Sequence, residues 1–222
     1  MSAHASHTPV HTHPLMPNAS QRLTSIAGSG FLGVGVPSHL GGHGGSLDEL
    51  FRDPTALRWL QGLQHPEQLI FRSQRLVVEA LVKTENIGLR ELRLPDLLRG
   101  DVAGASALES PQLEAQTQGT GWQFHGRLDG VPNLQWDGFF LLLPVQAAGL
   151  VEGVLLVSSE ENGMTVRPCE TTALGEFAAY GQVHFNRSFL RADEWLGGMP
   201  LWESLVHANE LLRQGLLHTH QR

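Results

Sequence analysis

The feature of this sequence that most constrains its fold is a change of hydrophobic period at Gly100. Before it, between Pro66 and Leu98, apolar residues recur at the spacing of a helix. After it, short runs rich in β-branched and aromatic residues are separated by Gly, Asn, Asp and Pro. Successive strand signals without helical patterns between them favour an antiparallel sheet or small barrel over a parallel sheet.

These patterns predict an α+β fold with an N-terminal helical segment, a central, mostly antiparallel β domain and a single C-terminal helix. Strands are expected at Gly104–Leu108, Leu113–Gln118, Trp122–Leu128, Phe139–Val145, Glu152–Val157, Gly163–Arg167 and Gln182–Phe189. A last helix is expected from about Pro200, with Leu201, Leu205, Ala208, Leu211, Leu212 and Leu216 on one face. The predicted segments are a tail at 1–27, a shortened helical domain at 28–100, the β domain at 101–192 and the C-terminal helix at 193–222.

The first 27 residues are rich in His, Ser, Thr, Pro and Ala and lack apolar periodicity, so we predict a disordered tail. Its histidines, His4, His7, His11 and His13, are spaced so that two or three reach one Zn or Cu ion. Nothing fixes their geometry, and an incidental His-rich tail is the favoured interpretation. No metal site is therefore predicted.

A glycine-dense run extends from Gly28 to Gly45 but lacks the spacing of a phosphate-binding loop. No Lys-Ser or Lys-Thr pair follows its last glycine. Ser46 and Glu49 instead have the spacing of a capping box, which predicts a turn leading into a helix. Further along, Pro95 is expected in the first turn of a short helix that Gly100 closes.

Charge and composition exclude several classes of function. The formal net charge is -7, and Lys83 is the only lysine, so no basic block is present and nucleic acid is an unsuitable partner. The longest apolar run, Gly138 to Val145, is too short to span a membrane. A single cysteine, Cys169, forms no intramolecular disulfide and fits a reducing compartment, so we expect a cytoplasmic location.

Several chemically capable residues are better explained by structural roles. Glu160 and Glu161 are adjacent acids in a predicted turn, where carboxylates point apart into solvent. No histidine lies next to Cys169 in sequence to activate it. His125 and His184 alternate with apolar residues in predicted strands, and for Trp136, Trp195 and Trp202 packing is the default role.

Four segments of the sequence, taken in order, carry a resemblance to one known protein family. The first is GVGVPSHLGGHGGSLDEL at 33–50, and the second is LRELRLPDLLRGDVAGASALESP at 89–111. The third is GTGWQFHGRLDGVPN at 119–133, and the fourth is GQVHFNRSFLRADEWLG at 181–197. These segments resemble motifs of the acyl-CoA dehydrogenase family and together cover roughly residues 33–200, so the chain resembles a shortened and divergent member.

The resemblance implies an FAD-dependent oxidoreductase that dehydrogenates the CH–CH group of an acyl-CoA thioester. The cofactor-facing positions that it implies are Leu108, Glu109, Ser110 and Asn133. The family's Thr-Glu-Pro falls on Glu109, Ser110 and Pro111, so an acid replaces the hydroxyl that meets the flavin edge. The family's Trp and Thr at the second contact fall on Gly130 and Pro132.

Catalytic residues are not assigned, because the resemblance places the base in a third helical domain that one helix represents here. Two hypotheses remain open: an FAD-dependent dehydrogenase completed by a partner chain, and a non-catalytic relative or interaction subunit without flavin. The leucine stripe of the last helix, which is expected to be uncovered, predicts a homo- or hetero-oligomer through this helix. The alternative is that the helix folds back and completes the core of the first domain.

Overall fold

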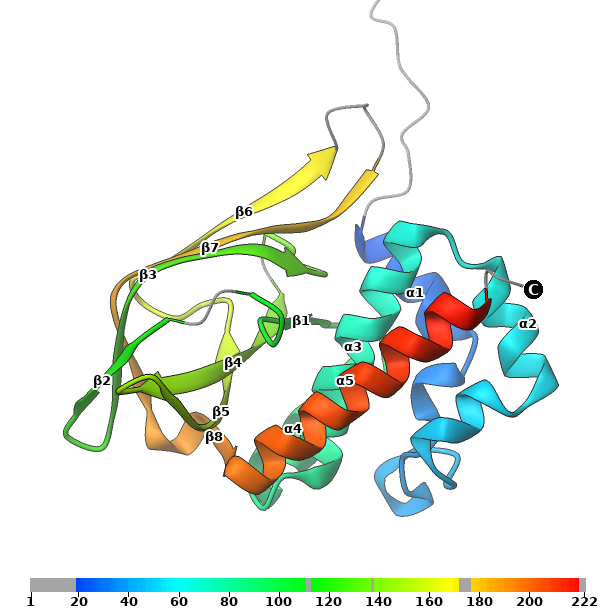
Figure 1. Cartoon of the computed structure of the whole chain (residues 1–222), viewed down its shortest axis with the longest axis horizontal. Helices are drawn as coiled ribbons and strands as arrows, with labels where there is room; N and C mark the ends of the chain where they lie inside the picture. Colours follow the sequence, from blue (N-terminus) through cyan, green and yellow to red (C-terminus); the bar gives the residue numbers. More distant parts are fainter. Residues whose placement is uncertain (1–18, 111–112, 137, 172–176, 220–222) are drawn as a thin grey trace, which may run out of the picture.

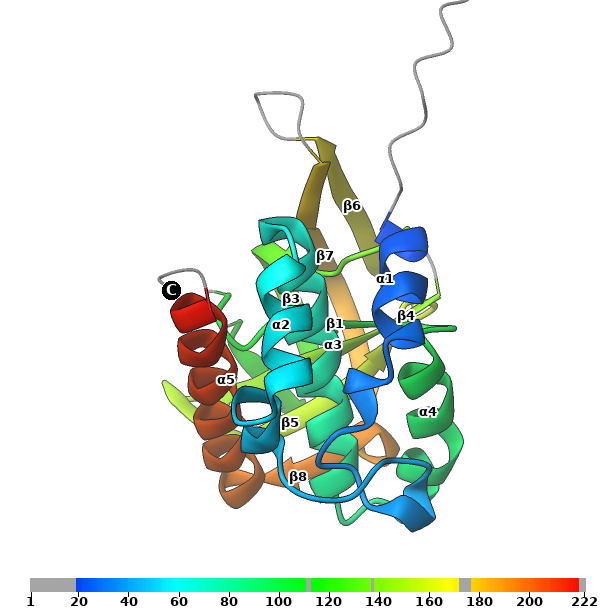
Figure 2. The same cartoon turned by 90° about the vertical axis from the view of Figure 1, so that its right-hand side faces the viewer.

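The computed structural model of the protein describes residues 19–110, 113–136, 138–171 and 177–219. The helices pack together beside a β part made of two sheets (Figure 1). Figure 2 shows α1 to α5 gathered on one side of the sheets. This arrangement confirms the predicted α+β class with a single helix after the β domain.

The helical part is built around α3 (His65–Lys83), whose central residues are almost all buried. Around it lie α1 (Ala19–Gly28), α2 (Pro54–Gly62) and α4 (Ile87–Arg99), with short 3₁₀ helices η1 (Phe31–Gly33), η2 (Ser38–Leu40) and η3 (Leu47–Phe51). The predicted capping box of Ser46 and Glu49 is present, although it starts a 3₁₀ turn rather than an α-helix. Gly100 closes α4 with a left-handed φ of 72°, as predicted.

Two details of the helical part correct the sequence predictions. Residues 19–27 were expected in the tail, but they belong to α1. Leu23 and Ile26 of α1 are buried, and this tertiary burial stabilises a segment whose composition alone does not predict a helix. Pro95 was expected to start a short helix, but it lies inside the continuous α4. The histidines of the N-terminal tail lie outside the described residues.

The β part has two four-stranded sheets. One has the order β1 (Ala103–Ser106), β4 (Phe139–Ala147), β5 (Leu150–Ser158) and β8 (Trp195–Gly198). The other has the order β2 (Ala115–Gln118), β3 (Gly121–Pro132), β7 (Phe177–Arg191) and β6 (Met164–Thr171). All pairs are antiparallel except β1 with β4, which is parallel. Each of the seven predicted strands is found, while β8 extends the sheet past the predicted boundary at 192.

The last helix, α5 (Met199–Thr219), lies across α3 and also packs on α2, β5 and β8 (Figure 1). Its leucine stripe is covered by this packing: Leu205 and Leu212 are completely buried, and Leu201 and Leu216 nearly so. The expectation of an uncovered stripe is therefore wrong, and the alternative, that the helix folds back onto the chain's own helical part, is confirmed. The chain's own helices and sheet bury these leucines, each of which contributes about 1.5–3 kcal/mol.

Among the described residues, no helix combines the length and apolarity needed to cross a membrane.

Candidate functional site

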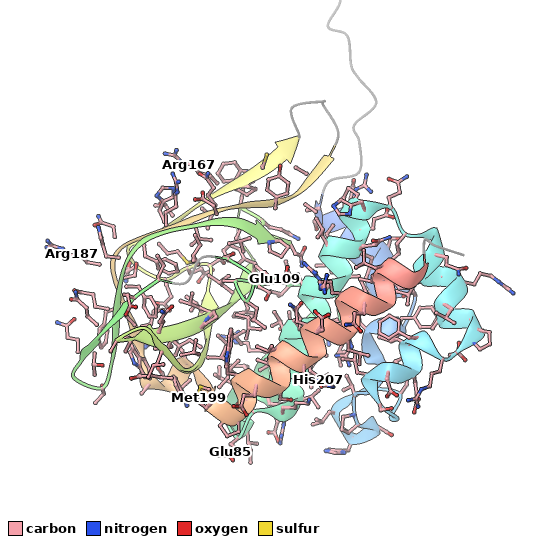
Figure 3. All side chains as sticks on the ribbon, in the orientation of Figure 1. Glu85, Glu109, Arg167, Arg187, Met199 and His207 are labelled. Carbon is pink, nitrogen blue, oxygen red and sulfur yellow. The ribbon has the colours of Figure 1, made fainter. Side chains whose placement is uncertain are left out.

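Glu109 follows β1 and lies where the β part meets the helices (Figure 3). Its carboxylate accepts two hydrogen bonds from the Arg72 guanidinium of α3, at 3.2 and 2.6 Å. It also accepts a hydrogen bond of 2.9 Å from Nδ2 of Asn209 on α5. One side chain thus joins the loop after β1 to two helices.

Charge strengthens this junction. The side chain of Arg72 is 13% exposed and that of Glu109 is 46% exposed, so the pair is partly shielded from water. The pKa of the Arg213 guanidinium on α5 lies above its ordinary value, chiefly because of its bonds to Glu210, with a smaller contribution from Glu109. Glu109 therefore lies in a positive environment supplied by α3 and α5. We call Glu109, Arg72 and Asn209 the Glu109 junction.

The neighbours of Glu109 make a tight turn after β1. The Leu108 backbone N–H points to Oγ of Ser106 at 3.4 Å. Ser110 is buried, and its backbone N–H donates to the Ala107 carbonyl at 3.2 Å. These two N–H groups, at predicted cofactor positions, are thus used within the turn.

Asn133, the fourth predicted position, is buried directly after β3, at the end of the β2–β3 hairpin. Its backbone has a left-handed φ of 56°, which Asn tolerates better than most residues. Its Nδ2 donates to Oε1 of Gln74 and to the Gly104 carbonyl, both at 3.1 Å. The side-chain amide therefore fastens the hairpin to α3 and β1.

Gln74 and Ser73 of α3 are contacts that the sequence analysis missed. Gln74 Nε2 donates to the Leu97 and Val102 carbonyls, and its Oε1 accepts from the Gly104 N–H at 2.6 Å. The Ser73 hydroxyl lies 2.9 Å from the Gly104 carbonyl and 3.2 Å from that of Pro132. The sequence did contain a signal for these contacts: two polar residues stand among the apolar residues of one helix. Buried polar groups need hydrogen-bond partners.

The other candidates do not form one site. In the described part of the chain, no group of three His, Cys, Asp or Glu side chains has metal-binding geometry. His125 is exposed, and Trp195 stacks on Trp122 at 4.9 Å between ring centroids. Glu161 lies beside Glu194, where burial, together with this second carboxyl, raises the pKa of Glu194 to about 7.

Comparison with known proteins places this fold. No protein-family model matches the sequence, and no curated protein matches it. Among solved structures, PigA with FAD and proline superposes with a TM-score of 0.74 at 15% identity, over 92% of this chain and 56% of that one. The chain has the acyl-CoA dehydrogenase fold.

Two further structures support this assignment. A glutaryl-CoA dehydrogenase from Mycobacterium smegmatis in complex with FADH2 gives a TM-score of 0.70 at 16% identity, over 86% of this chain and 51% of that one. The ChsE4–ChsE5 complex from Mycobacterium tuberculosis gives 0.68 at 21% identity, over 87% and 52%. The chain thus spans about half the length of the proteins that it resembles in structure.

The residues at the predicted flavin positions do not fit that cofactor. Glu109 carries no hydrogen to donate when ionised, and its carboxylate is already bonded to Arg72 and Asn209. Asn133 is 1% exposed and uses its amide hydrogens within the protein, while its Oδ1 has no hydrogen-bond partner among the described residues. Gly130 supplies no aromatic face for stacking. The Glu109 carboxylate and the Asn133 amide hydrogens thus hold parts of the protein together.

Proposed function

We propose that this chain is a flavin-free relative of the acyl-CoA dehydrogenases, which serves as a binding scaffold and not as an oxidoreductase. The Glu109 junction is the observation that carries the proposal. It joins three elements with the side chain that occupies the predicted flavin-edge position. A flavin edge placed there has to displace either Arg72 or Asn209.

The energetic argument favours the junction over a flavin. A hydrogen bond to a charged group contributes about 1.5–3 kcal/mol, less where water reaches the pair, as it does at Glu109. Opening the junction also leaves Arg72, which is mostly buried, without its carboxylate partner. A flavin that enters gains no hydrogen-bond donor from ionised Glu109, so the loss is not offset there.

Charge adds a second reason. A reduced flavin gains electron density on its ring, and a protein stabilises that form with hydrogen-bond donors or positive charge. A carboxylate at the ring edge does the opposite, because like charges repel. Once a flavin has displaced Arg72, the unpaired Glu109 carboxylate opposes both flavin binding and the reduced state that a dehydrogenase requires.

A second candidate is an FAD-dependent acyl-CoA dehydrogenase unit completed by a partner chain. The observation that favours it is the buried Oδ1 of Asn133, which has no hydrogen-bond partner among the described residues. The space around Gly130 is also open, since a Cβ built on its backbone meets no atom within 4 Å. In that case Glu109 swings away from Arg72 when the flavin enters.

Titration of FAD into the purified chain separates the two candidates. Under the scaffold proposal, wild-type protein gives no saturable change in flavin fluorescence polarisation. Glu109→Thr restores a hydroxyl and removes the carboxylate, and the matched control Glu203→Thr changes an exposed acid of α5. Saturable binding of FAD by the wild-type chain contradicts the proposal and favours the second candidate.

A further inference from the structure

A cavity of about 560 Å³ lies at the other end of the contact between α3 and α5. Lys83, at the end of α3, and Ser204, on α5, form one side of it. Its apolar side is formed mainly by Trp195, with the largely buried Leu196 of β8 and Leu201 of the first turn of α5 beside it. Its volume falls within the range of about 300–1,000 Å³ that small-molecule sites occupy.

The polar side of the cavity carries one net positive charge. Glu79 is shared between Arg75, at 3.3 Å, and Lys83, at 2.9 Å. The row of Arg75, Glu79 and Lys83 therefore has one net positive charge, and Lys83 is its only member among the residues that line the cavity. The Lys83 side chain is 40% exposed at the cavity, where a ligand is able to reach it.

Lys83 still has a hydrogen to donate. Its ammonium group carries three N–H donors, and two of them meet Glu79 and the Ser204 hydroxyl, the latter at 2.6 Å. The Ser204 oxygen accepts from Lys83, so its own O–H is oriented away from the ammonium. The start of α5 adds the partial positive charge of a helix N-terminus.

One acidic group limits the ligand. Glu85 lies on the exposed rim of the cavity and opposes the approach of a highly charged anion. A single net positive charge facing one rim carboxylate suits a monoanion better than a doubly charged phosphate. The apolar wall suits an aliphatic or aromatic body attached to that anion.

We propose that this cavity binds a small organic monocarboxylate, with its carboxylate at Lys83 and Ser204 and its apolar body against Trp195, Leu196 and Leu201. The site is separate from the Glu109 junction. Arg72 and Lys83 lie on the same helix three turns apart, about 16 Å along its axis. The inference goes beyond the proposed scaffold function, since it concerns another part of the molecule.

Hexanoate titration of the full chain tests this site, with tryptophan fluorescence and thermal denaturation as the two measurements. We expect a saturable response to hexanoate and none to 1-hexanol, which has a similar body without the charge. Lys83→Met weakens hexanoate binding about tenfold or more, as expected for loss of a charge-assisted hydrogen bond. Lys83→Arg keeps the charge and retains most of the affinity.

Arg58→Met is the matched control, because Arg58 is an exposed cation on α2 that does not line the cavity. If Lys83→Met does not fold, Ser204→Ala is measured instead and is expected to weaken binding severalfold. The proposal is overturned if hexanoate gives no saturable response, if hexanol binds equally well, or if the folded cavity variant binds as the wild type does. Absence of flavin binding affects none of these outcomes, so the two proposals fail separately.

Discussion

The two ends of the α3–α5 contact are built differently. At one end Glu109 bonds Arg72 and Asn209 and joins both helices to the loop after β1. At the other end Lys83 bonds Ser204 beside a cavity of about 560 Å³. Between them on α5, Leu205 is completely buried and Ala208 is 3% exposed. The α3–α5 pair is therefore bonded to the loop after β1 at one end and borders a cavity at the other. Buried apolar side chains hold the two helices together between these ends.

Truncation of the apolar middle is the change with the largest expected effect, because it loosens both ends together. Leu205→Ala removes a completely buried side chain and should lower the free energy of unfolding by about 2–5 kcal/mol. Val206→Ala, on the exposed side of the same helix, should change it by less than about 0.5 kcal/mol. Urea denaturation followed by circular dichroism measures both. Equal effects of the two changes contradict the packing of α5 described above.

The next largest effect on stability is expected at Asn133, which bonds to α3 and β1. Asn133→Ala removes the amide bonds to Gln74 and Gly104 and places alanine at a left-handed φ, so we expect a loss of about 2–3 kcal/mol. Asn133→Gly removes the same bonds without the backbone strain and should cost about 1 kcal/mol less. Thermal and urea denaturation compare the two variants. An alanine variant as stable as the glycine variant rules out the backbone contribution.

At the end of the α3–α5 contact that borders the cavity, the free energy of unfolding should depend on pH through Glu194, which directly precedes β8. Burial raises the pKa of Glu194 to about 7, so the folded protein favours its neutral form. The resulting stabilisation is fully present below the unfolded pKa of about 4.5 and is lost as the pH rises through about 7. We expect the loss to be on the order of 1–2 kcal/mol.

Glu194→Gln keeps a neutral side chain at every pH and should flatten this dependence. Melting temperatures measured between about pH 4.5 and pH 8 provide the check. The variant should gain stability relative to the wild type as the pH rises. Parallel pH profiles of the two proteins mean that Glu194 has an ordinary pKa.

The smallest expected effect concerns the ion pair itself. Glu109→Gln and Arg72→Met should each lower stability by about 1 kcal/mol, because Glu109 is nearly half exposed. The double variant should lose less than the sum of the two, since both single changes break the same contact. A double-mutant cycle by urea denaturation measures this coupling. Strict additivity shows that the two side chains do not interact in solution.

Local sequence patterns predicted much of the fold, because hydrophobic spacing and turn residues reflect interactions between residues that are close in sequence. The seven predicted strands were found because alternation and turn residues mark them directly. By contrast, β8 is a four-residue strand with two glycines that forms by pairing with β5. Helix α1 is stabilised by burying Leu23 and Ile26 against distant residues. Neither has a strong local signal.

Motif order predicts that Glu109 and Asn133 face a cofactor, and this stays a prediction. The structure adds the contacts of these residues, which the sequence did not predict. The partners of Glu109 lie 37 and 100 residues away in sequence, and only the fold brings Arg72 and Asn209 to it. The leucine stripe on α5 showed the same limit: its spacing identified a buried face, but not that the chain itself covers it.

The visible absorption spectrum of the full chain, purified without added cofactor and then after incubation with excess FAD and desalting, tests the central claim most directly. The scaffold account predicts no flavin absorption bands in either sample, because Glu109, Arg72 and Asn209 bond to one another where a flavin edge would lie. Stoichiometric flavin that remains on the wild-type protein after desalting contradicts it.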